Sequence, residues 1–210
     1  MEQSNNPILP DYLMEVDTDG IHQGIVYNGD NYLIKPDISP ILENHFLIIP
    51  KKHVFCMNSS ALNNSKDELR MVEKKLVEYY HGIGKGYLFF EHGCCSDKAS
   101  GSSCIHHAHL HAIPVTLDQE KKIIHEVIKE LGAPALSFKD VETMEYLYLE
   151  TENAGSMYWA DLARQSQLFR ILISKTIGDV RRSRWQNCLV DEKQRQKSKE
   201  WLKKFEFFSF

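Results

Sequence analysis

Three histidines alternate with smaller or apolar residues in His107-Ala108-His109-Leu110-His111, and this spacing constrains the local fold more than any other feature of the chain. Successive side chains of a β-strand point to opposite faces, so a strand would place the three imidazoles in one row, with neighbours roughly 6 to 7 Å apart. A helix would scatter them, because same-face neighbours on a helix recur every three or four residues. The spacing therefore predicts a strand. Three buried imidazoles would each need hydrogen-bond partners, so their alignment favours a functional site over simple packing.

Length and composition limit the class of protein. A chain of 210 residues suits one domain with an extension or two small domains, and 42% hydrophobic with 26% charged residues is typical of a globular protein. The net charge of -4 and the pI near 6.2 argue against a general nucleic-acid surface and favour small-molecule partners. The apolar runs are too short to span a membrane, the first residues lack a secretion signal, and five cysteines fit a reducing compartment. We therefore expect a cytoplasmic protein without a membrane or nucleic-acid partner.

The order of the expected elements indicates an α+β fold. Turn-forming residues and alternating patterns predict strands at residues 24–27, 32–34, 45–50, 87–91 and 104–113, a hairpin at 146–159, and helices at 65–80, 119–131, 165–177 and 191–204. Ser65 and Glu68 have the spacing of a capping box at the start of the first helix. We expect an antiparallel α+β unit in residues 1–115 and a C-terminal extension of mixed helix and hairpin in residues 116–210.

Two blocks of the sequence resemble the histidine triad (HIT) family. Residues 107–113 fit the family signature, in which three histidines alternate with apolar residues and two more apolar residues follow. Residues 37–40 and 45–53 are similar to the stretch that precedes the triad, and the matching segments together cover roughly residues 24–115. The resemblance implies a catalytic domain with a small antiparallel sheet and packed helices, usually in a homodimer. It also implies an enzyme that hydrolyses or transfers nucleotidyl groups.

The resemblance assigns roles to individual residues. The middle histidine, His109, would attack an α-phosphorus to give a covalent nucleotidyl-imidazole, which water or another acceptor resolves. His107 would orient and polarise the neighbouring ring, and His111 would donate to a phosphate oxygen. Asp37 falls where the family holds the ribose hydroxyls, and Ile38 falls where it packs near the nucleoside. Neutral imidazole is nucleophilic near neutral pH, so the chemistry is compatible with these roles.

Some positions depart from the family pattern. Ser103 and Cys104 stand where the family commonly has an amide residue and then a hydroxyl residue, and Glu91 stands where a neutral amide is frequent. We still expect Ser103 to be able to contribute a donor to the phosphate. These departures concern the phosphate contacts and the choice of substrate.

A metal site is the first alternative at this part of the chain. Cys94, Cys95 and Cys104 with His92 and His106 could be taken as a zinc cluster, and a row of three imidazoles could itself hold a metal. However, no CxxC pair is present in the sequence, and adjacent cysteines are poor tetrahedral partners. We therefore expect neither a metal nor a cofactor.

Other polar residues are expected to have ordinary structural roles. His45 and His53 are expected at strand ends. Arg170, with residues 165–167, could approach the phosphates, but a solvated helix face is the expected position. The arginines of residues 181–184 could bind an anion, although such runs are usually exposed.

These observations lead to one main hypothesis and two rivals. The main hypothesis is a HIT-type hydrolase or transferase that acts through His109 on a nucleoside phosphoramidate, a dinucleoside polyphosphate or a related nucleotide conjugate. The first rival is a catalytically silent nucleotide-binding regulatory module, and the second is a metal-dependent hydrolase. Binding without turnover would favour the first rival, and loss of activity on chelation would favour the second.

Overall fold

The computed structural model describes residues 26–93, 107–137, 139, 141, 145–160, 167–177 and 179–203. Seven strands form one antiparallel sheet in the order β1-β2-β3-β5-β4-β6-β7. The strands are β1 (Tyr27–Asn28), β2 (Tyr32–Pro36), β3 (Phe46–Pro50), β4 (Gly86–Gly93), β5 (Leu110–Val115), β6 (Tyr146–Thr151) and β7 (Gly155–Ala160). The α-helices are α2 (Lys66–Gly82), α3 (Leu117–Leu131), α4 (Leu168–Thr176), α5 (Trp185–Val190) and α6 (Glu192–Lys203), with 3-10 helices η1 (Ser60–Ser65) and η3 (Val180–Ser183). The prediction of an α+β fold with an antiparallel sheet is confirmed.

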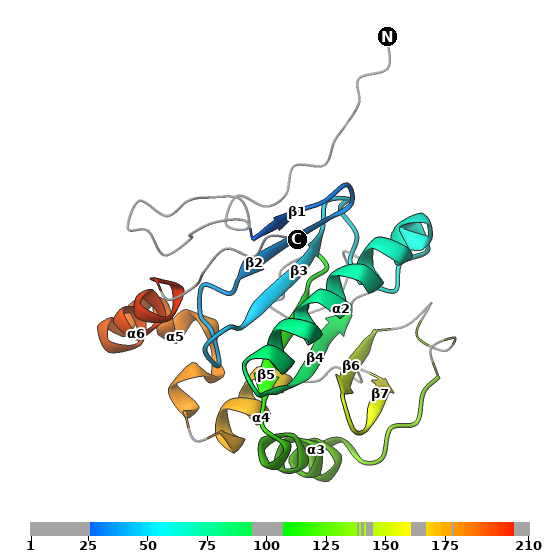
Figure 1. Ribbon diagram of the computed structural model, residues 1–210. Helices are drawn as coiled ribbons and strands as arrows, with labels where there is room; N and C mark the ends of the chain where they lie inside the picture. Colours follow the sequence, from blue (N-terminus) through cyan, green and yellow to red (C-terminus); the bar gives the residue numbers. More distant parts are fainter. Residues whose placement is uncertain are drawn as a thin grey trace.

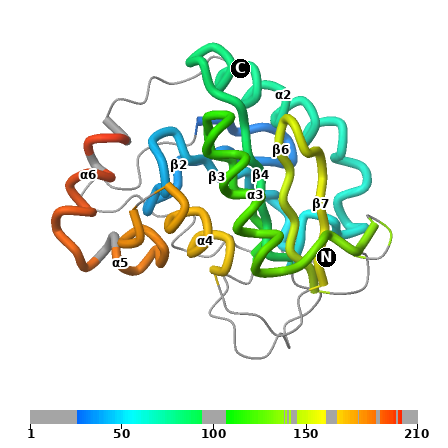
Figure 2. Tube along the Cα trace, turned by 90° about the horizontal axis from the view of Figure 1, so that it is seen from below, coloured from blue at the N-terminus to red at the C-terminus, as the bar shows by residue number. Residues whose placement is uncertain are grey.

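Helices cover both faces of the sheet (Figure 1). On one face, α2 packs Val72, Leu76 and Tyr80 onto the inward side chains of β2, β3 and β5. On the other face, α3 and α4 pack onto β4, β5, β6 and β7, and Figure 2, which is seen from below, shows these two helices side by side in front of the strands. Along β4, Phe89 therefore belongs to the α2 face and Phe90 to the face of α3 and α4. This alternation follows from the two-residue period of a strand that is buried on both sides.

The start of α2 differs from the expected capping box. Ser65 precedes the helix, but its side chain makes no capping hydrogen bond and instead donates to the carbonyl of Leu62. The carboxylate of Glu68 turns to the β1–β2 connection, where it accepts hydrogen bonds from the backbone N–H groups of Asn31 and Tyr32. Glu68 thus holds the β1–β2 turn onto the helix, and neither expected partner caps the helix end.

The sheet continues beyond residue 115, the boundary expected from the sequence. β6 pairs with β4 from Leu88↔Thr151 to Gly93↔Tyr146, so the hairpin of β6 and β7 extends the same sheet. The division into residues 1–115 and 116–210 remains a prediction, for which a test is given in the Discussion. No helix among the described residues has the length and apolar character needed to cross a membrane.

Candidate functional site

The triad lies at the N-terminal end of β5, a central strand of the sheet. Only His111 is within the strand, where it stands opposite Leu47 of β3 and Phe90 of β4. Its ring stacks on Phe90 with a centroid distance of 4.3 Å and an interplanar angle of 6°. His107 and His109 come just before β5, because the strand begins at Leu110 and not near residue 104 as expected. Residues 104–106 lie outside the described part of the chain.

His109 has one ring nitrogen fixed by the backbone. Its Nδ1 lies 2.9 Å from the carbonyl oxygen of His107, and a carbonyl oxygen can only accept, so Nδ1 carries the proton in this contact. The neutral ring therefore has its free lone pair on Nε2. His109 is partly exposed, whereas His107 and His111 are buried, and its ring centroid lies 4.9 Å from that of His111. A nucleophilic nitrogen is thus available beside a second imidazole.

The His107 side chain is held away from the His109 ring. Its Nε2 donates to the carbonyl oxygen of Pro50 over 2.7 Å, and its ring packs edge-on against His53 at a centroid distance of 5.1 Å. Residue 107 therefore orients the His109 ring through its main-chain carbonyl, while its side chain fastens this segment to the end of β3.

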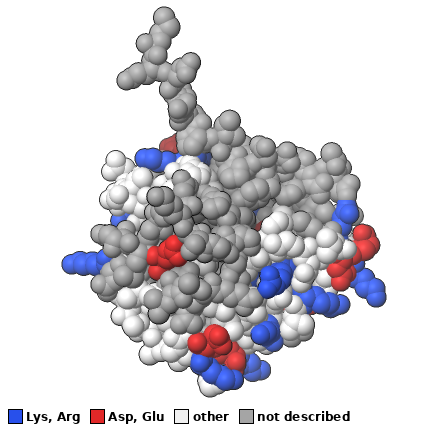
Figure 3. All heavy atoms as spheres, turned by 180° about the vertical axis from the view of Figure 1, so that it is seen from behind, with Lys and Arg blue, Asp and Glu red and all other residues white. Residues whose placement is uncertain are grey.

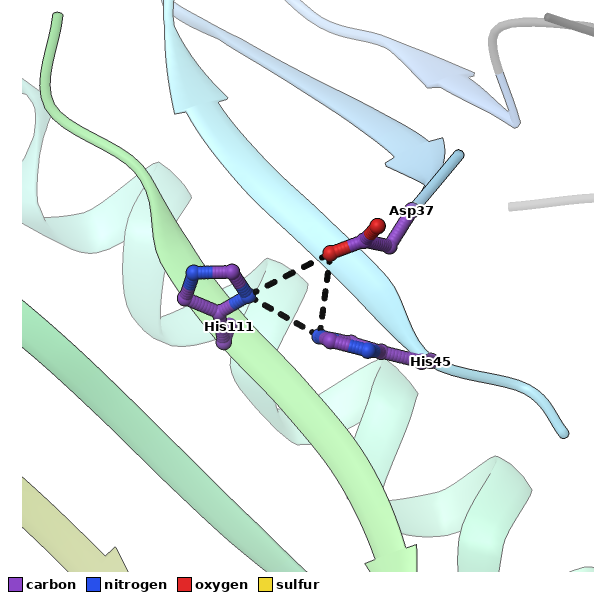
Figure 4. A group of neighbouring side chains, drawn as sticks. All are labelled: Asp37, His45 and His111. Carbon is purple, nitrogen blue, oxygen red and sulfur yellow. Dashed lines mark hydrogen bonds and ion pairs between the residues drawn. The ribbon is translucent and has the colours of Figure 1, made fainter. Parts of the chain in front are cut away.

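Behind the triad, Asp37, His45 and His111 form a buried cluster (Figure 4). The backbone N–H of Ile41 donates to His45 Nδ1 over 3.1 Å, which leaves the proton of the neutral His45 ring on Nε2. His45 Nε2 lies 2.9 Å from His111 Nδ1 and 3.5 Å from Asp37 Oδ2. If His45 Nε2 donates to His111 Nδ1, the proton of the neutral His111 ring is on Nε2. One backbone amide thus sets the tautomers of two histidines in sequence.

The same three residues offer ligand atoms that all lie within 4.8 Å of one another, which is a spacing that a metal ion could use. Two contacts oppose a metal here. His45 would have to give up its Nε2 proton while Nδ1 still accepts from Ile41, and the guanidinium of Arg170 already lies 2.9 Å from Asp37 Oδ2. A metal ion here would lie close to the positive charge of Arg170, and it would need the His45 ring to become an imidazolate. Both conditions are unfavourable. The contacts fit a hydrogen-bonded cluster better than a metal centre.

Arg170 reaches this cluster from α4, in the C-terminal half of the chain. Arg170 is only 4% exposed, so the expectation that it lies on a solvated helix face is wrong. Nη1 bonds Asp37 Oδ2, and Nη2 donates to the carbonyl oxygen of Ser39 and lies 3.2 Å from the Ser39 hydroxyl. Burial raises the pKa of Asp37, but the ion pair with Arg170, together with His45 and the Ser39 amide, holds that pKa below its ordinary value.

The site favours neutral imidazoles. Burial lowers the pKa of His45 to about 3, and burial with the nearby His109, His45 and Arg170 holds the pKa of His111 well below its ordinary value. The pKa of His109 is also lowered, first by desolvation and further by Arg170, against the opposing effects of the His107 carbonyl and Asp37. A neutral His109 keeps its Nε2 lone pair at neutral pH.

The remaining expected site residues occupy different positions. Ile38 is partly exposed in the β2–β3 connection next to Asp37, whereas Asp37 itself is buried. Glu91 is buried on β4, where Oε1 accepts from the Met57 N–H and Oε2 accepts from the Tyr146 hydroxyl. Ser103 lies outside the described residues, as do Cys94, Cys95, Cys104 and His106 of the alternative zinc cluster.

Sequence reasoning missed two members of the site. His45 was expected only as a strand-end residue, and its signal was the histidine in the block that precedes the triad in the resemblance. The apolar residues that flank Arg170 could have signalled its burial, but no local pattern indicates Asp37 as its partner, since 133 positions separate the two in sequence.

An antiparallel sheet with a histidine triad at the start of a central strand defines a HIT-like protein. A comparison with family models then gives the particular family: residues 21–127 match the family described as "Protein similar to CwfJ C-terminal", and the chain belongs to that family. The matched segment contains the whole triad and Asp37, and ends within α3.

Individual relatives are more distant. The chain is 24% identical over 195 residues to zinc finger CCCH domain-containing protein 59 of Oryza sativa subsp. japonica, and the match covers 81% of the chain and 30% of that protein. The chain thus spans about a third of the length of this relative. Among solved structures, it is similar to a hypothetical histidine triad nucleotide-binding protein from Sulfolobus tokodaii strain 7, with 27% identity, a TM-score of 0.33, and coverage of 44% of this chain and 60% of the other.

Proposed function

We propose that this protein binds a nucleotide conjugate at the triad and transfers or hydrolyses its nucleotidyl group through His109. The substrate class is a nucleoside phosphoramidate, a dinucleoside polyphosphate or a related conjugate. The observation that carries the proposal is the Nδ1 contact of His109 with the His107 carbonyl, which leaves the Nε2 lone pair free on a partly exposed ring.

Two displacements would account for the reaction. In the first, His109 Nε2 forms a bond to the α-phosphorus, and the bond from phosphorus to the leaving group breaks, with the electron pair and then a proton going to the leaving group. In the second, water adds to phosphorus, loses a proton, and the phosphorus–nitrogen bond breaks to return His109. The N–H at His111 Nε2, inferred from the contact with His45, would donate a hydrogen bond to a phosphate oxygen as charge develops there.

The β2–β3 connection would form the nucleoside side of the site. Ile38 is partly exposed and would pack near the nucleoside. Asp37 would hold a ribose hydroxyl through a lone pair that its contacts with Ser39 and Arg170 leave unused. We keep Ser103 in the proposal as a phosphate donor on the strength of its place before the triad in the sequence.

The test is His109→Ala in the full chain, with a panel of adenosine and guanosine phosphoramidates and dinucleoside polyphosphates. We expect turnover to fall by about 1,000-fold or more, because no other group supplies the covalent step. Nucleotide binding should be retained, and intact mass should show a nucleotidyl adduct on the unsubstituted protein that the variant lacks. His125→Ala, which removes a 75% exposed side chain on α3, is the matched control.

Three other outcomes would contradict the proposal or favour a rival. Turnover that persists in His109→Ala contradicts the assignment of the nucleophile. Binding across the panel with no turnover and no adduct favours the silent nucleotide-binding module. Activity that disappears on chelation and returns with zinc favours the metal-dependent hydrolase.

A further inference from the structure

Two buried arginines from the C-terminal part of the chain bind the same short connection between β2 and β3. Arg170 bonds the Asp37 carboxylate and the carbonyl oxygen of Ser39, and Arg182 donates to the carbonyl oxygen of Pro40. Arg182 is fully buried, and its guanidinium lies 4.4 Å from the ring centroid of Trp201 on α6. The first part of the connection, residues 37–40, is thus held by residues that follow it by more than 130 positions.

The middle of this connection contacts the histidine cluster. Ile41, the next residue after Pro40, supplies the backbone N–H that bonds His45 Nδ1. His45 then faces His111 Nδ1, so the position of one backbone amide decides which nitrogen of each ring carries a proton. A displacement of the connection would release this chain of contacts without any change in the triad itself.

We propose that Arg170 is a positioning residue of the triad: by binding Asp37 and Ser39 it holds Ile41 against His45, and thereby fixes the Nε2–H tautomer of His111 beside His109. This inference rests on the proposed function, because it gives α4 a part in the same site. It also gives the C-terminal part of the chain a role at a triad that lies at the start of β5.

The positive charge of Arg170 also lowers the pKa values of the imidazoles at the triad. His109 lies beside the His111 ring, and its pKa is lowered first by desolvation and then by Arg170 and His92, against the opposing effects of the His107 carbonyl and Asp37. His45 and His111 are likewise subject to the positive charge of Arg170. Loss of this charge, with Asp37 left as an unpaired carboxylate, should make all three imidazoles easier to protonate.

The experiment compares Arg170→Gln with the unsubstituted full chain by two-bond proton–nitrogen NMR of the histidine side chains. In the unsubstituted protein we expect single Nε2–H tautomers for His45 and His111 and an Nδ1–H tautomer for His109. In Arg170→Gln we expect mixed tautomers for His45 and His111 and protonation at higher pH for all three rings. Arg70→Gln is the matched control, because it removes a guanidinium that is 73% exposed on α2.

A second variant protects the test from a failure to fold. Removing one member of a buried ion pair leaves an uncompensated charge, whereas removing both does not. Arg170→Gln combined with Asp37→Asn therefore removes both charges and the contact with Ser39 together. We expect mixed tautomers here as well. Unchanged tautomers of His45 and His111 in both variants would overturn the inference.

Kinetics separate this inference from the proposed function. On a substrate that the unsubstituted protein turns over, we expect kcat/KM of Arg170→Gln to fall by about 100-fold and its acidic limb to move to higher pH. No turnover by the unsubstituted protein would remove the proposed function, while the tautomers would still test Arg170. Full turnover by Arg170→Gln with unchanged tautomers would remove the inference and leave the function in place.

Discussion

Glu91 is the residue whose burial has the clearest consequence for stability. Its side chain is buried on β4, and burial raises its pKa from the ordinary value of 4.5 to about 7, against the hydrogen bonds from Tyr146 and Met57. The folded protein therefore binds this proton more tightly than the unfolded chain. The resulting stabilisation is present below about pH 4.5 and is lost as the pH rises through about 7, and it amounts to roughly 3 kcal/mol.

Glu91→Gln should flatten this part of the pH dependence. The amide has no charge to desolvate, can accept the Met57 N–H and can donate to the Tyr146 hydroxyl. We expect the free energy of unfolding of the variant, relative to the unsubstituted protein, to rise by about 3 kcal/mol between pH 4.5 and 8. Urea unfolding at several pH values measures it, with Glu78→Gln as a control at an exposed position of α2. A constant difference across this range would show that folding does not raise the pKa of Glu91.

His45 changes the stability in the opposite direction to Glu91 as the pH rises. For this reason the free energy of unfolding of Glu91→Gln must be compared with that of the unsubstituted protein at each pH. Its pKa is about 3 in the folded protein, below its ordinary value of 6.5, so its contribution to stability is lost as the pH falls below 6.5. Between about pH 4.5 and 6.5 the loss from Glu91 and the gain from His45 oppose each other as the pH rises, so the stability of the unsubstituted protein alone does not isolate Glu91.

At the scale of elements, α3 shows how local sequence caps the N-terminal end of a helix. The Thr116 hydroxyl accepts the Gln119 N–H over 3.2 Å, and the Gln119 side chain accepts the Thr116 N–H over 2.9 Å. This capping box satisfies two backbone groups that would otherwise lack partners. At α2 the same kind of pattern is present in the sequence, but Glu68 binds the β1–β2 connection instead.

Thr116→Ala should lower the free energy of unfolding by about 1 kcal/mol, because the cap hydroxyl is lost while the helix remains. A chain of this size should then melt roughly 2 to 4 °C lower. Calorimetry or circular dichroism measures the shift, and Thr116→Ser, which keeps the hydroxyl, should restore most of it. If the serine variant is as unstable as the alanine variant, the threonine methyl group and not the cap is responsible.

The elements that the sequence predicted best are those with strong periodicity. The apolar spacing of α2 and α3 and the turn between β6 and β7 were readable from local residues, and all three are confirmed. The strand that carries the triad was also predicted, but its start was placed too early, because alternation continues through His107 and His109 while the described ladder begins at Leu110. Periodicity reports which face a side chain takes and not where pairing starts.

Such patterns could not predict the tertiary contacts of the site. His109 and His111 could be expected near each other from their spacing alone. The apolar neighbours of Arg170 in sequence are typical of a buried helix, but its contact with Asp37 depends on how α4 packs against the sheet. Contacts between residues so distant in sequence are decided by the packing of whole elements.

At the scale of the whole molecule, charge does not divide the surface into two simple faces. On the face shown in Figure 3, the described lysine and arginine side chains stand beside aspartate and glutamate side chains. Some basic side chains of the C-terminal helices make contacts within the protein. Arg182 is buried, and Lys197 forms an ion pair with Asp179. The arginine run at residues 181–184 is therefore partly structural.

The sheet and the core bear on whether residues 1–115 and 116–210 unfold separately. β6 is hydrogen-bonded to β4 along six residue pairs, and one core cluster joins Phe90 and Ile113 to Ile123, Trp159 and Phe169. Separation at residue 115 would expose this shared apolar surface and an edge of β4. We therefore predict a single cooperative unfolding transition for the whole chain.

The three tryptophans make this prediction measurable, because all of them follow residue 115. Their fluorescence reports the C-terminal part, while the backbone amide NMR signals of Ile48 and Ala112 report the part that carries the triad. In urea, the two sets of signals should change with the same midpoint. If the fluorescence changes first and the amide signals persist, residues 1–115 form an independent domain, and the contact of Arg170 with Asp37 joins two separable units of the chain.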